Sequence, residues 1–334
     1  MQPISPRPLA ILGAGHFGTA LAQQAARAGL GVRLWCRDPA QAAHILATGR
    51  NPRCLSTFRL HSGVQPTADL TAAVAHCAGI LLAVASEHVR PLLQQLGPHC
   101  QSADVLLASK GLEAGSLDTM VGVAVDVLGV AMQPKLLALS GPSFAREIMA
   151  GQPTAVDLAC SQLTTATSWA EALSDACFRA HPCTDVAGVE MGGALKNIVA
   201  IAAGAVAGLG LGDNSRAAVL ALGLGEMVQL AACKGAQPAT LMGLSGVGDL
   251  VLTCTGPLSR NRALGEAIGR GESLARVLAG PALAEGVTAA AAAVALARRH
   301  GLTLPLMAAV HAILLGEADV TCLGAVLCAG RRGT

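Results

Sequence analysis

Short apolar runs alternate with stretches of helical length through the first half of this 334-residue chain. Apolar runs separated by helices are typical of a parallel sheet covered by helices. The runs that we expect to form strands are residues 9–12, 32–35, 80–85, 105–109 and 136–140, with residues 155–159 and 178–182 as further strands at the sheet edge. The pattern predicts a doubly wound α/β domain of Rossmann type.

The pattern changes near residue 185, beyond which Ala-, Gly- and Leu-rich helical patterns run nearly to the end of the chain. We therefore expect an α/β domain with a mostly parallel sheet over residues 1–187 and an all-α domain over residues 188–334. The apolar run 186–211 has the length of a membrane span but contains Glu190, Lys196 and many glycines. We expect it to be a helix buried in protein instead.

A glycine pattern, Gly13-x-Gly15-x-x-Gly18, lies between the first expected strand and the helix expected over residues 16–28. In that context the first glycine allows a tight turn, the second lets a pyrophosphate approach the backbone, and the third lets helix and strand pack closely. The phosphates would lie at the positive end of the helix. The pattern predicts a dinucleotide site.

The end of the second expected strand bears on the choice of dinucleotide. An acidic residue at this place binds the ribose 2′-hydroxyl of NAD, whereas an arginine favours the 2′-phosphate of NADP. Arg37 and Asp38 stand here side by side. Because Arg37 comes first and its guanidinium suits a phosphate, we expect NADPH, with NADH as the alternative.

Composition excludes several classes of protein. The chain is 52% apolar, 13% charged and 2% aromatic, with a net charge of +2. This gives neither a strong field for nucleic acid or membrane surfaces nor enough aromatic side chains for base stacking. The eleven cysteines form no C-x-x-C pair and no zinc spacing, so we expect no metal and reduced thiols in a cytoplasmic protein. The first eight residues carry three prolines and predict no signal peptide.

One lysine stands out in the apolar run. The chain has 19 Arg but only four Lys, and Lys196 lies within an Ala/Gly-rich segment beside Asn197. A buried ammonium is costly unless it is paired or used, and Glu190, six residues earlier, is poorly placed on a helix to pair with it. Lys196 is therefore either an ion-paired structural residue or a proton donor and acceptor whose pKa burial lowers.

A set of motifs follows in order along the chain. They are residues 13–18, 109–113 (SKGLE), 140–145 (SGPSFA), 188–190, 193–197 (GALKN), 243–254 (GLSGVGDLVLTC), 259–261 (SRN) and 285–286. Together they resemble the bacterial NAD(P)-dependent glycerol-3-phosphate dehydrogenases over essentially the whole chain. The resemblance implies reversible reduction of dihydroxyacetone phosphate to sn-glycerol 3-phosphate, a precursor of glycerophospholipids, by a homodimer.

The resemblance also implies roles for individual residues. Lys196 would donate the proton to the ketone oxygen, Lys110 would contact cofactor and substrate, and Asp249 would bind substrate and orient the lysine. The residues implied for the cofactor are Gly13, Gly15, His16, Phe17, Gly18, Arg37, Lys110, Ala145, Arg260, Leu283 and Glu285. Those implied for the substrate are Lys110, Gly141, Ser143, Lys196, Asn197, Asp249, Ser259, Arg260 and Asn261.

Some positions depart from the family pattern. Cys54 stands where the family usually has an aromatic residue, and Ser56 stands where the family has a proline. Ala85 replaces the proline of a Val-Pro-Ser motif. Two alternatives stay open: a related two-domain β-hydroxyacid-type dehydrogenase, and a non-catalytic sensor that binds NADPH.

Overall fold

The computed structural model describes residues 7–279 and 285–329. Its contacts divide the chain into two compact units. The first contains the described residues up to Ser109 together with Met120–Val186, and the second contains Lys110–Thr119 together with the described residues from Ala187 onward. The division expected from sequence, 1–187 and 188–334, differs in the segment Lys110–Thr119, which packs with the helical unit.

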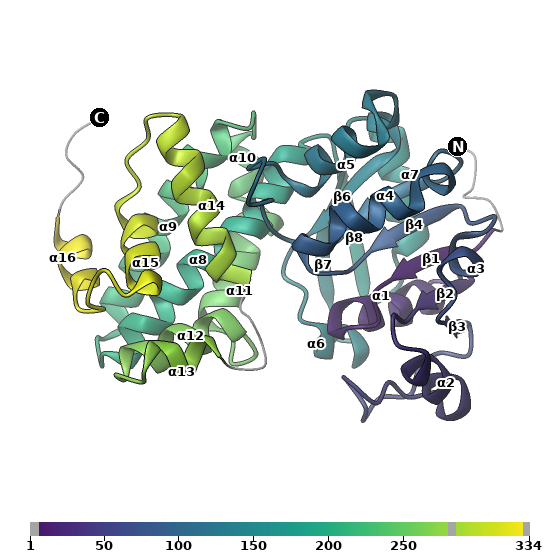
Figure 1. Cartoon of the computed structure of the whole chain (residues 1–334), viewed down its shortest axis with the longest axis horizontal. Helices are drawn as coiled ribbons and strands as arrows, with labels where there is room; N and C mark the ends of the chain where they lie inside the picture. The colour runs from purple at the N-terminus through teal and green to yellow at the C-terminus, as the bar shows by residue number, and fades with distance from the viewer. Residues whose placement is uncertain (1–6, 280–284, 330–334) are drawn as a thin grey trace. The chain divides into compact units, whose positions relative to one another are not determined.

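The first unit is built on an eight-stranded sheet in the order β3-β2-β1-β4-β5-β6-β7-β8 (Figure 1). Every neighbouring pair is parallel except β6 and β7. The strands are β1 (Leu9–Leu12), β2 (Val32–Trp35), β3 (Val64–Thr67), β4 (Gly79–Leu82), β5 (Asp104–Leu107), β6 (Leu136–Ser140), β7 (Thr154–Cys160) and β8 (Phe178–Cys183). The mostly parallel Rossmann-type sheet is thus confirmed. The expected strands are all present, whereas β3, an edge strand interrupted by Pro66, was not expected.

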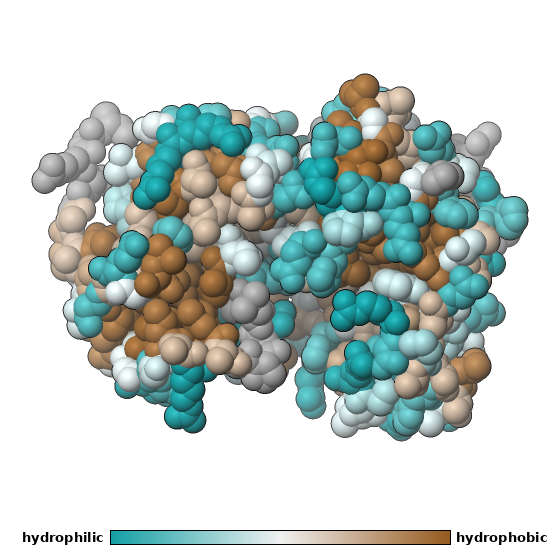
Figure 2. All heavy atoms as spheres, viewed as in Figure 1, coloured by the Kyte–Doolittle hydropathy of each residue, from teal (hydrophilic) through white to brown (hydrophobic). Residues whose placement is uncertain are grey.

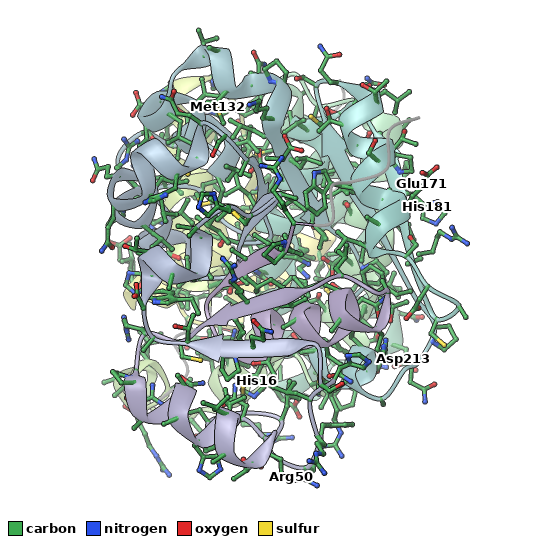
Figure 3. All side chains as sticks on the ribbon, turned by 90° about the vertical axis from the view of Figure 1, so that its right-hand side faces the viewer. His16, Arg50, Met132, Glu171, His181 and Asp213 are labelled. Carbon is green, nitrogen blue, oxygen red and sulfur yellow. The ribbon has the colours of Figure 1, made fainter. Side chains whose placement is uncertain are left out.

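Helices cover both faces of this sheet, with α1 packed on α6 and α7 and with α4 packed on α5 (Figure 1). They are α1 (His16–Arg27), α2 (Pro39–Thr48), α3 (Leu70–Val74), α4 (Val89–Cys100), α5 (Met120–Leu128), α6 (Ala145–Met149) and α7 (Leu163–Leu173), with 3-10 turns at Ser86–His88 and Val130–Lys135. Strands β1 and β4 are buried on both faces. Polar side chains such as Arg50, Glu171 and His181 are exposed and lie at the periphery of the unit (Figure 3).

In the second unit every regular element among the described residues is a helix, as predicted. The helices are α8 (Val186–Gly208), α9 (Asp213–Ala232), α10 (Pro238–Leu241), α11 (Asp249–Thr255), α12 (Arg260–Gly269), α13 (Leu274–Leu278), α14 (Glu285–Arg299), α15 (Pro305–Leu315) and α16 (Cys322–Cys328), with a π-helical turn at Leu244–Gly248. Small residues let them approach closely. A Cβ at Gly204 of α8 would lie 1.9 Å from the carbonyl oxygen of Arg262 of α12, and a Cβ at Gly265 would lie 1.9 Å from that of Ile201.

Helix α8 is the one described helix that is long and apolar enough by itself to cross a membrane, but 89% of its most apolar window is buried within the protein. Its buried apolar residues belong to the main core of the helical unit. The expectation of a helix buried in protein therefore agrees with the structure.

Candidate functional site

The glycine loop of the first unit has the geometry that its pattern predicts. Gly13 has a φ of +111°, and a Cβ there would lie 2.6 Å from the carbonyl oxygen of Ala83. A Cβ at Gly18 would lie 1.8 Å from the carbonyl oxygen of Gly13, so both positions require glycine. A Cβ at Gly15, by contrast, meets no atom within 4 Å among the described residues. The backbone at Gly15 therefore faces open space into which a ligand can fit.

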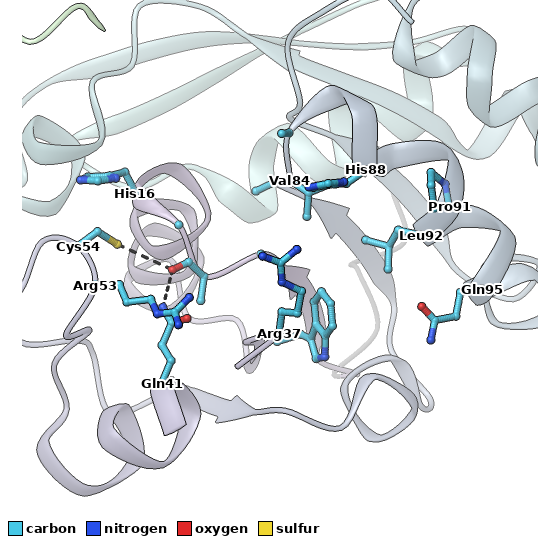
Figure 4. Close-up of a pocket in the computed structure, with 16 residues that line it drawn as sticks. His16, Arg37, Gln41, Arg53, Cys54, Val84, His88, Pro91, Leu92 and Gln95 are labelled. Atoms are coloured by element: carbon cyan, nitrogen blue, oxygen red, sulfur yellow. Dashed lines mark hydrogen bonds between the residues drawn. The ribbon is translucent and has the colours of Figure 1, made fainter. Parts of the chain in front are cut away.

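That open space belongs to a pocket of about 500 Å³ within the first unit. Residues 13–16 line one part of it, and residues 83–85 with His88 and Leu92 line another. Figure 4 shows Arg37 lying between Arg53 on one side and Leu92 and Gln95 on the other. Gly15 is the N-cap residue of α1 and provides no side-chain cap. The first turn of α1 contains no acidic residue. Such a helix start favours an anion.

A buried polar network holds the carbonyl of Ala14 in this loop. The side-chain amides of Gln41 and Asn51 donate to the Ala14 oxygen at 2.8 and 3.0 Å, and Asn51 also donates to the Thr19 hydroxyl at 2.8 Å. The Cys54 thiol lies 3.8 Å from the same oxygen (Figure 4). Gln41 and Asn51 were not predicted from the sequence, although the scarcity of asparagine in this chain is a signal that could have singled out Asn51.

The two residues at the end of β2 have different surroundings. Asp38 caps α2 by accepting from the Ala40 backbone N–H at 2.9 Å, and its other oxygen lies 2.5 Å from the Arg53 guanidinium. Arg37 lines the pocket. The carboxylate is thus already engaged twice within the protein, while two guanidinium groups border the pocket.

The other residues implied for this unit have different surroundings. His16 lines the pocket, but Phe17 is not among its lining residues and packs against the core of the first unit. Ala145, the first residue of α6, packs against the same core. Ser143 donates to the carbonyl oxygen of Gly141 at 2.8 Å in the turn after β6.

In the helical unit, two ammonium groups converge on one buried carboxylate. Lys196 Nζ lies 2.5 Å from Oδ1 of Asp249, and Lys110 Nζ lies 2.8 Å from Oδ2. Lys196 and Asp249 are 7% and 1% exposed. Lys196 comes from the middle of α8, Asp249 from the start of α11, and Lys110 from the segment Lys110–Thr119. The partner of Lys196 thus comes from α11 and not from its own helix.

Close backbone packing places Asp249 beside α8. A Cβ at Gly192, one helical turn before Lys196, would lie 2.4 Å from the carbonyl oxygen of Ser245. A Cβ at Gly246 would lie 1.8 Å from that of Leu241. The π-helical turn Leu244–Gly248 can therefore lie directly on α8, and Asp249 follows it immediately.

The electrostatics of this cluster favour proton exchange at Lys196. The pKa of Lys196 is lowered from 10.5 to about 8, because burial, aided by the Lys110 ammonium, outweighs the opposing attraction of Asp249. Burial alone would raise the pKa of Asp249, but the ammonium groups of Lys110 and Lys196 together hold it below its ordinary value. The carboxylate thus stays ionised while Lys196 can release a proton near neutral pH.

A second network lies beside this cluster. Asn197 donates to Glu285 at 3.2 Å, Asn261 donates to Asn197 at 2.9 Å, and the backbone N–H of Gly286 donates to Asn261 at 3.0 Å. Arg260, whose side chain is 60% exposed, lies 3.9 Å from Glu285. Ser259 caps α12 by accepting from the Arg262 N–H at 3.2 Å. The structure thus brings these implied residues together, whereas Leu283 lies outside the described residues.

The described residues include no group of three or more His, Cys, Asp or Glu that could hold a metal ion. The arrangement supplies instead a buried acid–base group and exposed polar side chains.

Comparisons with known proteins agree with this geometry. A family model described as the N-terminus of NAD-dependent glycerol-3-phosphate dehydrogenase matches residues 8–166, and the model of the C-terminus matches residues 185–324. The chain is 46% identical over 315 residues to a glycerol-3-phosphate dehydrogenase (NAD(P)+) of Rhodospirillum rubrum, covering 94% of this chain and 89% of that one. It is 46% identical over 312 residues to that of Caulobacter vibrioides, covering 93% of each.

Among solved structures, the glycerol-3-phosphate dehydrogenase of Coxiella burnetii superposes with a TM-score of 0.89 at 36% sequence identity. The match covers 96% of this chain and 98% of that one. The similarity therefore extends over both units and includes every motif described above.

Proposed function

The chain belongs to the NAD-dependent glycerol-3-phosphate dehydrogenase family, and from this we propose that it reduces dihydroxyacetone phosphate to sn-glycerol 3-phosphate, reversibly. The observation that carries the proposal is the buried Lys196 ammonium, 2.5 Å from the Asp249 carboxylate, with a pKa lowered to about 8. An amine with this pKa is matched to proton exchange with a substrate oxygen near neutral pH.

The residues of the helical unit divide the acid–base work. Lys196 gives its proton to the ketone oxygen during reduction and takes a proton from the alcohol during oxidation. Asp249 remains ionised, holds the Lys196 ammonium in place and contacts the substrate. Lys110 adds a second cation beside the reacting oxygen.

The phosphate of the substrate is assigned to the start of α12. Ser259, Arg260 and Asn261 present a helix N-terminus, a guanidinium and a side-chain amide, which suit a phosphate. We further assign Asn197, Gly141 and Ser143 to the substrate. When the phosphate is held, the ketone is oriented toward Lys196. This positioning by itself supplies part of the rate enhancement.

The first unit is assigned to the dinucleotide, which when bound supplies the hydride for the ketone carbon. Gly13, Gly15 and Gly18 shape the loop, and the start of α1 accommodates the pyrophosphate, with His16 and Phe17 beside it. Ala145, Lys110, Arg260 and Glu285 are assigned to further contacts with the cofactor.

NADPH is the dinucleotide that we favour. Because Asp38 already caps α2 and pairs with Arg53, it is poorly available to a ribose 2′-hydroxyl. Arg37 lines the pocket, and a guanidinium there suits a 2′-phosphate. NADH remains the alternative cofactor.

We place the enzyme in the cytoplasm as a homodimer that supplies glycerol 3-phosphate for glycerophospholipid synthesis. Apolar side chains gather on the face of the helical unit around α15, where Leu315 is 56% exposed (Figure 2). Such a surface is common at subunit interfaces. Light scattering on the purified protein measures the oligomeric state, and a monomer at micromolar concentration would contradict this part of the proposal.

The direct test is oxidation of NADPH, and separately of NADH, on addition of dihydroxyacetone phosphate to the purified protein. Loss of absorbance with that substrate, and much slower loss with β-ketoacids, is expected. Tight NADPH binding without turnover of dihydroxyacetone phosphate would instead favour the non-catalytic sensor. Turnover of a β-ketoacid alone would favour the β-hydroxyacid-type dehydrogenase.

A further inference from the structure

The segment Lys110–Thr119 connects β5 with α5 of the first unit, but it packs with the helical unit. It leaves the sheet after Ser109 and returns at Met120. Leu112 and Leu117 are buried in the core of the helical unit, and Leu112 forms an antiparallel bridge with Thr119. The segment is therefore a closed loop anchored in the unit that carries Lys196 and Asp249.

The backbone of this loop is strained. Leu117 has a φ of +62°, a left-handed conformation that residues with a Cβ rarely adopt. Within the loop, the N–H of Leu117 donates to Glu113 and the N–H of Glu113 donates to Asp118. A strained conformation persists only where its surroundings hold it in place.

One ion pair fastens the loop at the end opposite to Lys110. Lys234 Nζ, just beyond the end of α9, lies 2.5 Å from Oδ1 of Asp118, and the two side chains are 20% and 43% exposed. Lys234 is one of only four lysines in a chain with 19 arginines, and two of the other three form the buried cluster. The pair lies outside every residue assigned above to cofactor or substrate.

We propose that the Asp118–Lys234 ion pair positions the catalytic cluster by holding the loop Lys110–Thr119 in the conformation that presents the Lys110 ammonium to Asp249. The inference rests on the proposed function, since it concerns the geometry of that reaction. Lys234 and Asp118 are positioning residues that act through Lys110. A partly exposed pair gives a modest effect, because solvent screens its attraction.

The test compares Lys234→Met with Arg216→Met, a control that removes another surface ion pair of the same unit, between Arg216 and Asp213 in the first turn of α9. Lys234→Met is expected to lower kcat/KM for dihydroxyacetone phosphate by about 2- to 5-fold, the range that exposed ion pairs give. The Kd for NADPH is expected to change by less than kcat/KM, because most of the residues assigned to the cofactor lie in the first unit and only the Lys110 contact would be displaced. Arg216→Met is expected to match the wild type.

The pH profile separates positioning from a general loss of stability. Because the Lys110 ammonium lowers the pKa of Lys196, a displaced Lys110 lets that pKa rise. The alkaline limb of the reduction profile should therefore move to higher pH in Lys234→Met and in the isosteric Asp118→Asn. The charge-swapped double variant Asp118→Lys/Lys234→Asp should return the limb toward its wild-type position.

The proposal is overturned if both single variants keep the wild-type kcat/KM and the wild-type position of the alkaline limb. It is also overturned if the limb of the double variant lies no closer to the wild-type position than the limbs of the single variants. A wild type that fails to turn over dihydroxyacetone phosphate would contradict the proposed function instead. The ion pair can then still be tested without turnover, by competitive acetylation of Lys196 across pH with mass spectrometry. Lys234→Met should raise the pKa of Lys196 by that readout, and an unchanged pKa would refute the proposal.

Discussion

The two units hold their candidate functional groups by different means. In the first unit the loop is made of backbone, and its defining residues are glycines within six positions of one another. In the helical unit the cluster is made of charged side chains, and Lys110, Lys196 and Asp249 come from distant parts of the sequence. The first arrangement needs space and main-chain dipoles, whereas the second needs buried charges that balance one another.

This difference separates binding from chemistry. A backbone loop at a helix start has little capacity to exchange protons, but it accommodates phosphates without needing a titratable group. A buried ammonium beside a carboxylate contributes little to folding stability, but burial tunes its pKa for proton transfer. Changes in the first unit should therefore alter dinucleotide affinity, and changes in the cluster should alter turnover.

The sharpest test of this division is Lys196→Ala. We expect kcat to fall by about 10²- to 10⁴-fold, because the proton donor is lost, while the Kd for NADPH stays within about twofold. Stopped-flow reduction assays and fluorescence titration of NADPH measure the two quantities. Lys135→Ala, which removes a partly exposed lysine of the first unit, is the control and should leave both unchanged. Equal losses of turnover and of NADPH affinity would contradict the division.

Two glycine substitutions separate folding from binding within the loop. Gly18→Ala would bring a methyl group to 1.8 Å from the Gly13 oxygen, so we expect it to lower the melting temperature and abolish NADPH binding. The methyl group of Gly15→Ala would lie within 4 Å of no described atom, so the melting temperature should stay unchanged. The affinity for NADPH should nevertheless fall by about tenfold or more. Calorimetry gives both values. Unaltered NADPH affinity in Gly15→Ala would mean that the open space at Gly15 is not the pyrophosphate site.

The choice of cofactor should depend on one side chain of the first unit. Arg37→Ala is expected to lower kcat/KM for NADPH by about tenfold, because a charge-assisted contact to the 2′-phosphate is lost. The value for NADH should change by less than about twofold. Steady-state kinetics with both cofactors check this, and a parallel loss with NADH would assign Arg37 a structural role.

A change at a residue that is assigned to neither site should affect stability alone. The buried Glu226 carboxylate accepts from the backbone N–H groups of Leu306 and Met307, at 2.7 and 2.9 Å, at the start of α15. Glu226→Gln keeps one acceptor oxygen, so we expect a loss of about 1–2 kcal/mol in unfolding free energy and unchanged kcat. Urea denaturation measures the loss, with the exposed Glu317→Gln as a control. A drop in kcat without destabilisation would contradict this assignment.

The two units also differed in how far sequence could predict them. The strands β1, β2 and β6 and the loop at residues 13–18 follow from local patterns, because each depends on residues close together in the chain. The scarcity of lysine singled out Lys196, but its pairing with Asp249 joins residues 53 positions apart, and only the resemblance linked the two. No periodicity indicates that Lys110–Thr119 packs with the helical unit or that Lys234 meets Asp118.

Other contacts were hidden for a similar reason. Gln41 and Asn51 hold the Ala14 carbonyl through side-chain amides. Such hydrogen bonds have no characteristic spacing along the sequence by which they could be predicted. Cys54, a departure from the family pattern, lies beside the same carbonyl. The loop is thus supported by a polar network at the place where the family usually has an aromatic residue.

The central claim is that Lys196 is the proton donor and that Asp249 sets its pKa. The most direct measurement is the pH dependence of the reduction in the wild type and in Asp249→Asn. Below its pKa Lys196 carries the proton, so the wild-type rate should fall as pH rises through about 8, while the reverse oxidation rises over the same range. Because the Asp249 carboxylate raises the pKa of Lys196, the limb should move to lower pH in Asp249→Asn. A reduction rate with no such limb, or a limb that stays in place in Asp249→Asn, would contradict the account.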